Sequence, residues 1–164
     1  MKVILFGATG MIGQGVLREC LLAPDVERVL AVVRSSTGRV DPKLRELMHT
    51  NFASFAAIAS ELAGYDACFF CLGVSSAGLS EADYTKITHD TALAAAELLA
   101  RLSPTSVFTY VSGAGTDSSE RGAVMWARIK GKTENALLRL PFRAAYMFRP
   151  GLIQPLHGIR SKTP

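Results

Sequence analysis

Three glycines spaced three residues apart lie near the start of the chain, and they constrain its fold more than any other feature. They occur in the run Gly7-Ala8-Thr9-Gly10-Met11-Ile12-Gly13, after an apolar segment at 2–6 and before a segment with helical periodicity at 11–22. A tight turn between a strand and a helix needs residues without a Cβ atom. The pattern therefore predicts a strand, a glycine turn and a helix that ends before Pro24.

The same alternation of short apolar runs and helical segments continues along the chain. Further strands are predicted at 28–33, 46–52, 67–72, 106–111 and 143–148, with helices at 54–62, 81–102 and 123–140. The helix after Ser80 is expected to carry one face made of Tyr84, Ile87, Thr91, Ala94, Leu98 and Leu102. Strands that are apolar on both faces and alternate with helices are typical of a parallel sheet covered on each side. The sequence predicts an α/β, doubly wound, Rossmann-type fold of three layers with a mostly parallel sheet.

In this context the glycine turn is typical of a dinucleotide site. The backbone can approach a pyrophosphate closely there, and the N-terminus of the following helix offers unpaired N–H groups to its negative charge. A phosphate-binding loop of the nucleotide triphosphatases is excluded, because no Gly-Lys-Ser/Thr sequence follows the turn. With 164 residues, we expect one dinucleotide-binding domain over 1–164, with 151–164 as a tail and the substrate-shaping region short or missing.

The end of the second predicted strand bears on which dinucleotide is bound. That strand ends Val33-Arg34-Ser35-Ser36, without the carboxylate that usually binds a free ribose 2′-hydroxyl. Arg34 offers a charged fork, and Ser35 and Ser36 offer hydroxyls, for a 2′-phosphate. This favours NADP(H) over NAD(H); if Arg34 is only a solvated loop arginine, the choice stays open.

Charge and composition limit the partners. The net charge is +4, but residues 1–120 hold nine basic against thirteen acidic residues, and 121–164 hold nine against one. These basic residues are scattered and not interleaved with aromatic ones, which does not favour nucleic-acid binding. No run is apolar enough for a signal peptide or a membrane span, and three cysteines fit a reducing compartment. We therefore expect a cytoplasmic protein with no membrane partner; a homodimer is left open.

Several segments together resemble the short-chain dehydrogenase/reductase superfamily, in particular its NAD-dependent epimerase/dehydratase-like branch. They are Gly7–Gly13, Cys71-Leu72-Gly73, Tyr110-Val111-Ser112-Gly113, Lys130-Gly131-Lys132-Thr133-Glu134 and Phe148-Arg149-Pro150-Gly151. The resemblance implies a Ser–Tyr–Lys site in which the tyrosine exchanges a proton with the substrate oxygen. Ser112 and Lys130 match the serine and the lysine, but Trp126 stands where the tyrosine is expected. An indole N–H is a donor without acid–base chemistry near neutral pH.

Two functions remain open on this basis. One is an NADP(H)-dependent oxidoreductase or epimerase-like enzyme acting on a small carbonyl or hydroxyl substrate, with Ser112 and Lys130 as the remaining catalytic residues. The other is a non-catalytic, NADP(H)-binding regulator or protein-interaction module. In both, the expected cofactor-binding residues are Gly7, Thr9, Gly10, Met11, Ile12, Gly13, Arg34, Ser35, Leu72, Gly73, Val74, Lys130 and Pro150.

Cysteines and histidines do not favour a redox or metal site. Cys68 and Cys71 have C-x-x-C spacing, but residues three apart on a strand point to opposite faces. His49, His89 and His157 lie far apart without ligand spacing. We expect no metal.

Overall fold

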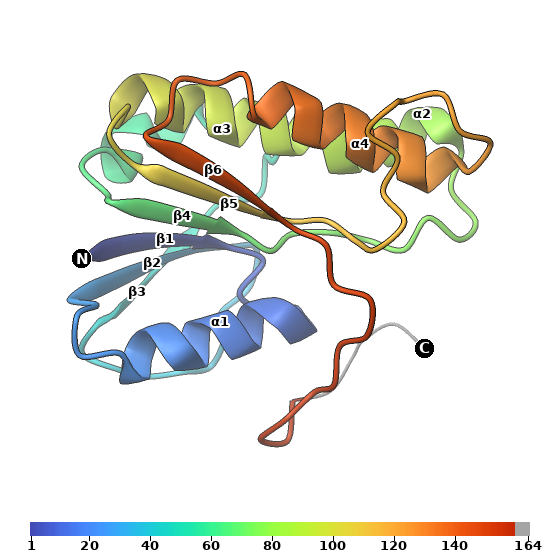
Figure 1. The fold of residues 1–164 in the computed structure, drawn as a ribbon. Coiled ribbons are helices and arrows are strands. Elements are labelled where there is room, and N and C mark those ends of the chain that lie inside the picture. The colour runs from blue at the N-terminus through green and yellow to red at the C-terminus, as the bar shows by residue number, and fades with distance from the viewer. Residues whose placement is uncertain (160–164) are drawn as a thin grey trace.

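A six-stranded parallel sheet forms the centre of the molecule in the computed structural model, which describes residues 1–159. The strands lie in the order β3-β2-β1-β4-β5-β6, and each neighbouring pair is parallel (Figure 1). Their bounds are β1 (Lys2–Phe6), β2 (Arg28–Val33), β3 (Leu44–Met48), β4 (Ala67–Phe70), β5 (Val107–Val111) and β6 (Ala144–Phe148). The predicted doubly wound α/β fold is confirmed.

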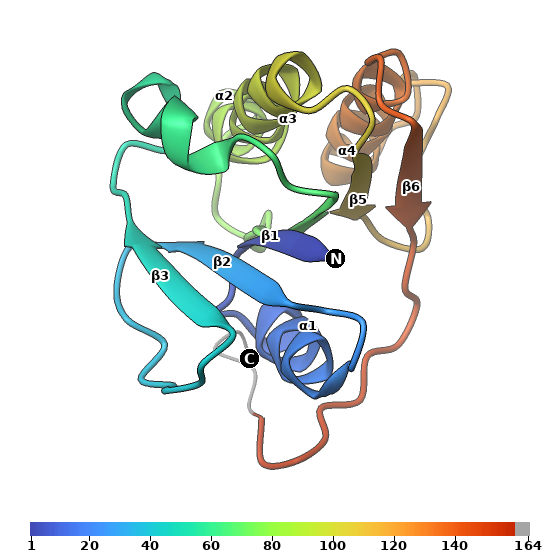
Figure 2. The same cartoon turned by 90° about the vertical axis from the view of Figure 1, so that its left-hand side faces the viewer.

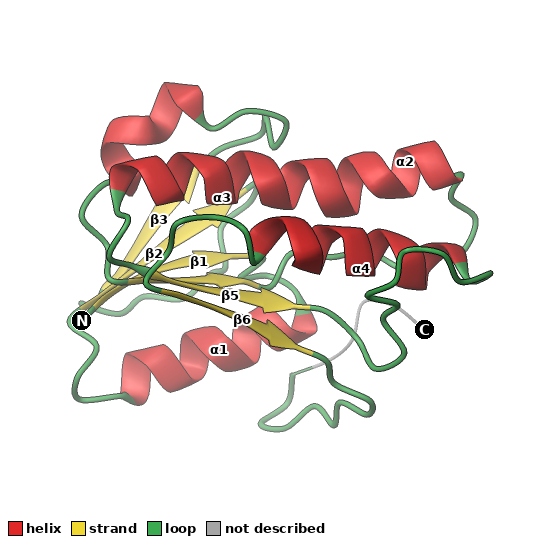
Figure 3. Cartoon of the chain, turned by 45° about the horizontal axis from the view of Figure 1, so that its top comes forward, coloured by secondary structure: helices red, strands yellow, loops and turns green. Residues whose placement is uncertain are grey.

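Helices cover both faces of the sheet and complete the three layers. Helix α1 (Met11–Leu22) lies on one face (Figures 1 and 2). The opposite face carries η1, α2, η2, α3 and α4, with α4 beside α3 in Figure 3. Their bounds are η1 (Ala56–Leu62, a 3₁₀ helix), α2 (Glu81–Thr85), η2 (Lys86–Asp90, a π helix), α3 (Thr91–Leu102) and α4 (Met125–Leu137).

Two apolar cores follow from the alternation of side chains along the central strands. Val3 and Leu5 of β1 pack with Leu17 of α1 on one side of the sheet. Ile4 and Phe6 pack on the other side, where Leu62, Ala95, Leu99, Phe108 and Leu137 join them. The central strands β1 and β2 are therefore buried on both faces, which explains their uninterrupted apolar runs in the sequence.

The third strand was predicted at 46–52, and this was wrong by about half its length. β3 pairs with β2 from Leu44 to Met48, where β2 reaches its own last residue, Val33. Beyond that point no strand is available for pairing, so the chain turns and the Phe52 ring packs against the core instead. The other predicted strands and helices agree with the structure except for shorter ends, a 3₁₀ helix in place of the helix predicted at 54–62, and the segment after Ser80.

The segment after Ser80 begins as predicted but is not one regular helix. The Ser80 hydroxyl accepts a hydrogen bond from the Asp83 amide at 3.1 Å. The π turn at η2 then rotates the following helix, because it holds more residues than an α-helical turn. Tyr84 is buried, but the predicted face is only partly so: α3 buries Ala95, Ala96 and Leu99 more completely than Ala94 or Leu98.

Within residues 1–159, α1 is the one helix on its side of the sheet. It lies below β1 and β2, and the strands at the other edge have no helix beneath them (Figure 2). The side chains of Tyr146 and Phe148 on β6 are accordingly more than half exposed. Residues 151–159 of the predicted tail contain no helix or strand, and 160–164 lie outside the described residues. Among the described helices, none has the length and apolar character needed to span a membrane.

Candidate dinucleotide site

The glycine turn is shaped by two contacts that exclude a side chain. Gly7 has φ +81°, and a Cβ atom there would lie 2.7 Å from the Cys71 carbonyl carbon and the Leu72 nitrogen. A Cβ on Gly13 would lie 2.0 Å from the Gly7 carbonyl oxygen. Gly7 therefore lets β1 turn sharply next to the end of β4, and Gly13 lets α1 pack directly on that turn.

Helix α1 starts at this turn with its first amides free of side-chain caps. Gly10 is the N-cap residue, and no described side chain accepts from the first turn, which holds no acidic residue. The first N–H groups of a helix have no partner within it, and the helix dipole favours negative charge there. The structure thus leaves a set of main-chain donors for an anion, as a diphosphate bridge requires.

A single pocket of about 390 Å³ runs along the carboxyl ends of the central strands. It begins at Arg34 after β2, passes over the glycine turn and reaches Ser112 after β5. The glycine turn and the ends of four strands line it: Gly7, Ala8, Thr9, Gly10, Met11, Ile12, Val32, Val33, Arg34, Phe52, Cys71, Leu72, Gly73, Val74, Ser75, Val111, Ser112 and Lys130. In parallel α/β sheets, ligands bind in this position.

Most of the site residues predicted from the sequence meet in this lining, but four do not. Gly13 packs against the Gly7 carbonyl group, and its lack of a side chain allows α1 to approach the turn closely. Pro150 contributes its carbonyl oxygen to the Ala114 amide at 2.9 Å and so anchors the loop after β5. Trp126 lies outside the pocket lining. Ser35 lines a second pocket of about 190 Å³.

This second pocket lies beside the glycine turn, between α1 and the loop that follows β2. Its lining is rich in hydroxyls and amides: Ala8, Thr9, Gln14, Leu17, Ser35, Ser36, Thr37 and Arg39. Arg34, which is exposed, lines the larger pocket next to it. Thr37 and Arg39 were not predicted as site residues, because their roles depend on how the loop folds back over α1.

Ser112 is buried at the far end of the larger pocket, and its hydroxyl proton is already in use. Its Oγ lies 2.9 Å from Thr116 Oγ1, and Thr116 Oγ1 donates its own proton to the Gly113 carbonyl oxygen at 2.8 Å. Thr116 can therefore only accept from Ser112. In this arrangement Ser112 offers lone pairs rather than a proton to a ligand.

Lys130 projects from α4 into the same end of the pocket. Its Nζ donates to the Ser112 carbonyl oxygen at 2.9 Å and lies 6.0 Å from the centre of the Tyr110 ring. Burial lowers the pKa of Lys130, and the negative charge of Glu134 opposes that shift only in part. The hydroxyls of Tyr110 and Tyr84 belong to the core, where burial raises the pKa of both. They are not available as substitutes for a catalytic tyrosine.

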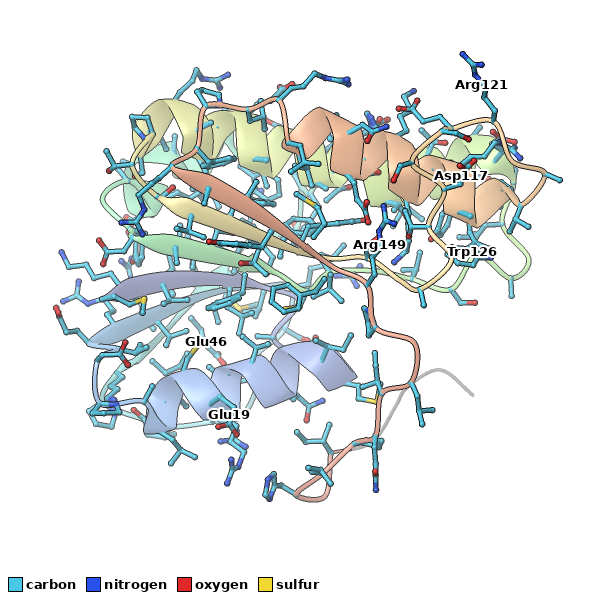
Figure 4. All side chains as sticks on the ribbon, in the orientation of Figure 1. Glu19, Glu46, Asp117, Arg121, Trp126 and Arg149 are labelled. Carbon is cyan, nitrogen blue, oxygen red and sulfur yellow. The ribbon has the colours of Figure 1, made fainter. Side chains whose placement is uncertain are left out.

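Trp126 packs over the loop after β5, one turn of α4 away from Lys130 (Figure 4). A Cβ atom on Gly115 would lie 3.5 Å from its ring, and one on Gly113 3.8 Å. The indole thus contacts the two glycines that flank Ala114. At the position where the resemblance implies a tyrosine, this chain has a large side chain that holds the loop.

The Lys130–Glu134 and Phe148–Gly151 segments, on which the family resemblance partly rests, have structural roles. Glu134, which is 2% exposed, receives hydrogen bonds from Arg149 Nε at 3.0 and 3.1 Å, and this pair joins α4 to the end of β6. Arg149 Nη2 also donates to Ser118 Oγ at 2.6 Å. A Cβ atom on Gly131 would lie 1.8 Å from the Asp117 carbonyl oxygen, so the 112–124 loop rests directly on α4.

The cysteines have the arrangement expected for core residues. Cys68 packs in the core on the α3 side, whereas Cys71 packs on the α1 side. Burial raises the pKa of the Cys68 thiol well above its usual value and that of Cys71 to about 12. Within residues 1–159, no three His, Cys, Asp or Glu side chains are grouped as metal ligands.

Comparison with known proteins shows which family model and which relatives the sequence of this chain matches. Residues 3–124 match the model of the NAD dependent epimerase/dehydratase family. The mitochondrial protein fmp52 of Emericella nidulans is 31% identical over 159 residues, which cover 93% of this chain and 66% of that protein. The rat protein HTATIP2 is 25% identical over 154 residues, covering 93% and 62%. This chain thus spans about two-thirds of the length of these relatives.

A solved structure agrees with the fold. The putative NAD-dependent epimerase/dehydratase from Bacillus halodurans superposes with a TM-score of 0.72 at 21% identity, over 94% of this chain and 72% of that one. The expectation of a cytoplasmic protein is contradicted by the curated relatives, because several fungal ones carry the word mitochondrial in their names. Cysteine count and apolar runs cannot distinguish one reducing compartment from another, which is why that expectation was wrong.

Proposed function

Because this chain belongs to the NAD-dependent epimerase/dehydratase family, we propose that its pocket binds NADP(H) and retains an oxidoreductase or epimerase-like site for a small carbonyl or hydroxyl substrate. One observation carries the proposal: a single pocket joins Arg34, the glycine turn, Ser112 and Lys130. These residues lie at the end of β2, after β1, after β5 and on α4, so that only the folded sheet brings them together.

The residues fit a dinucleotide along the length of this pocket. The free amides at the start of α1 would bind the diphosphate, and the two glycines leave the room that it needs. The Arg34 guanidinium would pair with a 2′-phosphate at one end. At the other end Lys130 would hold the ribose next to the nicotinamide, with the backbone of Leu72–Val74 on the opposite wall.

Bound nicotinamide supplies hydride chemistry, so this chain's own residues need to orient the substrate oxygen and handle its proton. Ser112 can accept a hydrogen bond from a hydroxyl group but has its own proton engaged by Thr116. The Ser75 hydroxyl, which also lines this pocket, is a far weaker acid than an ammonium group, so we take the Lys130 ammonium as the proton donor. Its lowered pKa brings it closer to the range in which a general acid is effective.

A second candidate function, dinucleotide binding without turnover, is favoured by Trp126. Its indole packs on Gly113 and Gly115 and cannot relay a proton. If the chain has lost proton transfer only through this replacement, Trp126→Tyr will produce NADPH consumption with small carbonyl compounds that the natural chain does not reduce. If both proteins turn over at similar rates, Trp126 is not the reason for a loss, and the enzyme candidate stands.

Cofactor binding itself is tested by thermal shift with NADPH and NADH side by side. A ligand that binds the folded state at 100 times its Kd stabilises by about 2.7 kcal/mol, which raises Tm clearly. We expect a larger rise with NADPH than with NADH, and a loss of that difference in Arg34→Ala. Equal shifts in the natural chain would contradict the NADP(H) preference, and no shift with either would contradict the site.

A further inference from the structure

Glu46 of β3 holds the loop that follows β2. The Thr37 amide donates to Glu46 Oε1 at 2.8 Å, and the Thr37 hydroxyl donates to the same carboxylate oxygen. β3 runs parallel to β2 with Glu46 next to Ala31, three residues before Arg34. Glu46 shares its side of the strand with Leu44, which packs in the α1-side core, and Figure 4 places it on that side of the sheet. The contact therefore closes the loop back onto the sheet beside α1.

The loop is further ordered by its own hydroxyls. The Gly38 amide donates to Ser36 Oγ at 3.0 Å, and the Arg39 amide donates to Thr37 Oγ1 at 3.2 Å. Gly38 has φ +72°, a conformation that favours glycine. Thr37 Oγ1 thus accepts a hydrogen bond from the Arg39 amide and donates one to the Glu46 carboxylate. Glu46 therefore fixes the backbone at Thr37 directly and the backbone at Arg39 through the Thr37 hydroxyl.

The loop held in this way forms one wall of the second pocket. Ser35, Ser36, Thr37 and Arg39 line it, opposite Gln14 and Leu17 of α1 and beside Thr9 of the glycine turn. Without the contact to Glu46, these four residues would have to be ordered each time a ligand binds. Ordering side chains and loops on binding lowers the affinity for the ligand.

The charge of Glu46 acts in the opposite direction, since a carboxylate near an anion-binding wall repels the anion. Burial acts to raise the pKa of Glu46, but the hydrogen bonds from Thr37 and Ser36 outweigh it and lower that pKa. Glu46 is therefore ionised at neutral pH. The two views predict opposite results when the charge and its hydrogen bonds are removed.

We propose that Glu46 is a positioning residue for NADP(H) specificity: by holding Thr37, it preforms the loop that directly follows Arg34, and so fixes the groups beside the 2′-phosphate that Arg34 is proposed to bind. The proposal rests on the proposed function, because it assumes that NADP(H) binds along the glycine turn. It adds a residue from β3, which does not itself contact the ligand, to the determinants of cofactor choice.

The test measures the dissociation constants of NADPH and NADH by calorimetry for the natural chain, Glu46→Ala and Glu46→Gln. We expect Glu46→Ala to weaken NADPH binding about tenfold, equal to about 1.4 kcal/mol, and NADH binding by less than about twofold. Glu46→Gln keeps an oxygen that accepts from Thr37 and should retain most of the NADPH affinity. Glu61→Gln is the matched control: Glu61 pairs with Arg45 on the surface at 2.6 Å and lines neither pocket.

Each other outcome overturns a defined part of the account. Equal weakening of both dinucleotides would make Glu46 a general structural residue, and tighter NADPH binding in Glu46→Ala would favour the repulsion view. Unchanged affinities would show that the loop needs no anchor. If the natural chain binds NADPH no more tightly than NADH, the proposed NADP(H) preference is wrong. If the natural chain prefers NADPH and Glu46→Ala prefers it to the same degree, only the proposed role of Glu46 is wrong.

Discussion

The two ends of the pocket differ in what their residues do. At the β1–α1 end, Gly7 and Gly13 leave space, and the first amides of α1 carry no side-chain cap among the described residues. At the β5–α4 end, Trp126 fills space, the Ser112 proton is engaged by Thr116, and Glu134 binds Arg149. At the β1–α1 end, backbone amides are available to a ligand. At the β5–α4 end, the side chains are already engaged in contacts with one another.

Under the proposed function, the chain keeps the features expected to bind a dinucleotide, whereas the Ser–Tyr–Lys site implied by the resemblance lacks its tyrosine. A catalytic tyrosine can be replaced by a packing residue while the fold remains intact. Variants at either end should therefore separate ligand affinity from stability.

The largest expected effect comes from Gly13→Ala at the β1–α1 end. Its Cβ atom would lie 2.0 Å from the Gly7 carbonyl oxygen, so α1 must move away from the turn. We expect a loss of about 3 kcal/mol in the free energy of unfolding, the upper part of the range for overpacked sites, and no measurable NADPH binding. Denaturant unfolding and calorimetry measure the two effects.

Gly15→Ala is the matched control in the same helix, because a Cβ atom there meets no atom within 4 Å. Alanine is favoured over glycine inside a helix by about 0.5–1 kcal/mol. The control should thus be as stable as the natural chain or more so, and should bind NADPH normally. A Gly13→Ala variant that binds NADPH like this control would remove the glycine turn from the site.

Arg149→Ala should reduce stability at the β5–α4 end while leaving the glycine turn intact. The substitution leaves the buried Glu134 carboxylate without its partner, which lowers the free energy of unfolding by about 3–5 kcal/mol in fully buried pairs. Because the Arg149 side chain is 39% exposed, we expect a loss of about 3 kcal/mol, at the lower end of that range. Arg45→Ala, which breaks a surface pair, should cost at most about 1 kcal/mol. Urea unfolding gives both values, and similar losses in the two variants would show that the Glu134 pair is unimportant.

Thr116→Val should have a smaller effect and alter Ser112. It removes the partner of the Ser112 hydroxyl and the donor to the Gly113 carbonyl, for a loss of about 1 kcal/mol. Because the Ser112 proton is then free, carbonyl reduction, where it occurs, should rise rather than fall. Parallel measurements of unfolding and of NADPH consumption distinguish this from simple damage to the loop, which would lower both.

The smallest effect is expected for Asp117→Asn, and it depends on pH. Hydrogen bonds from the Ser119 hydroxyl and the Gly122 amide lower the pKa of Asp117 from 3.8 to about 2. A carboxylate with a lowered pKa contributes stability above its unfolded value, and that contribution is lost as pH falls through the folded value. The natural chain should therefore have a slightly higher Tm than Asp117→Asn at pH 7, with the difference disappearing between pH 3.8 and about 2. A difference that persists unchanged in acid would assign the effect to something other than this charge.

The sequence predicted the sheet, the glycine turn and most of the pocket lining, because each depends on local pattern. Apolar runs identify buried strands, and the position of Gly7–Gly13 between strand and helix identifies the turn. The end of β3 was misplaced because it depends on where its neighbour β2 stops. The π turn at η2 and the anchoring of Thr37 by Glu46 depend on contacts between distant segments, which periodicity does not contain.

Under the proposed function, main-chain amides at the start of α1 hold the diphosphate of a bound dinucleotide. Titration of the ¹⁵N-labelled chain with NADPH tests it directly by observing those amides one by one. We expect the resonances of Thr9, Gly10, Met11 and Ile12 to shift most, together with that of Arg34. Saturable NADPH binding that leaves these amides unshifted, or no binding at all, would contradict it.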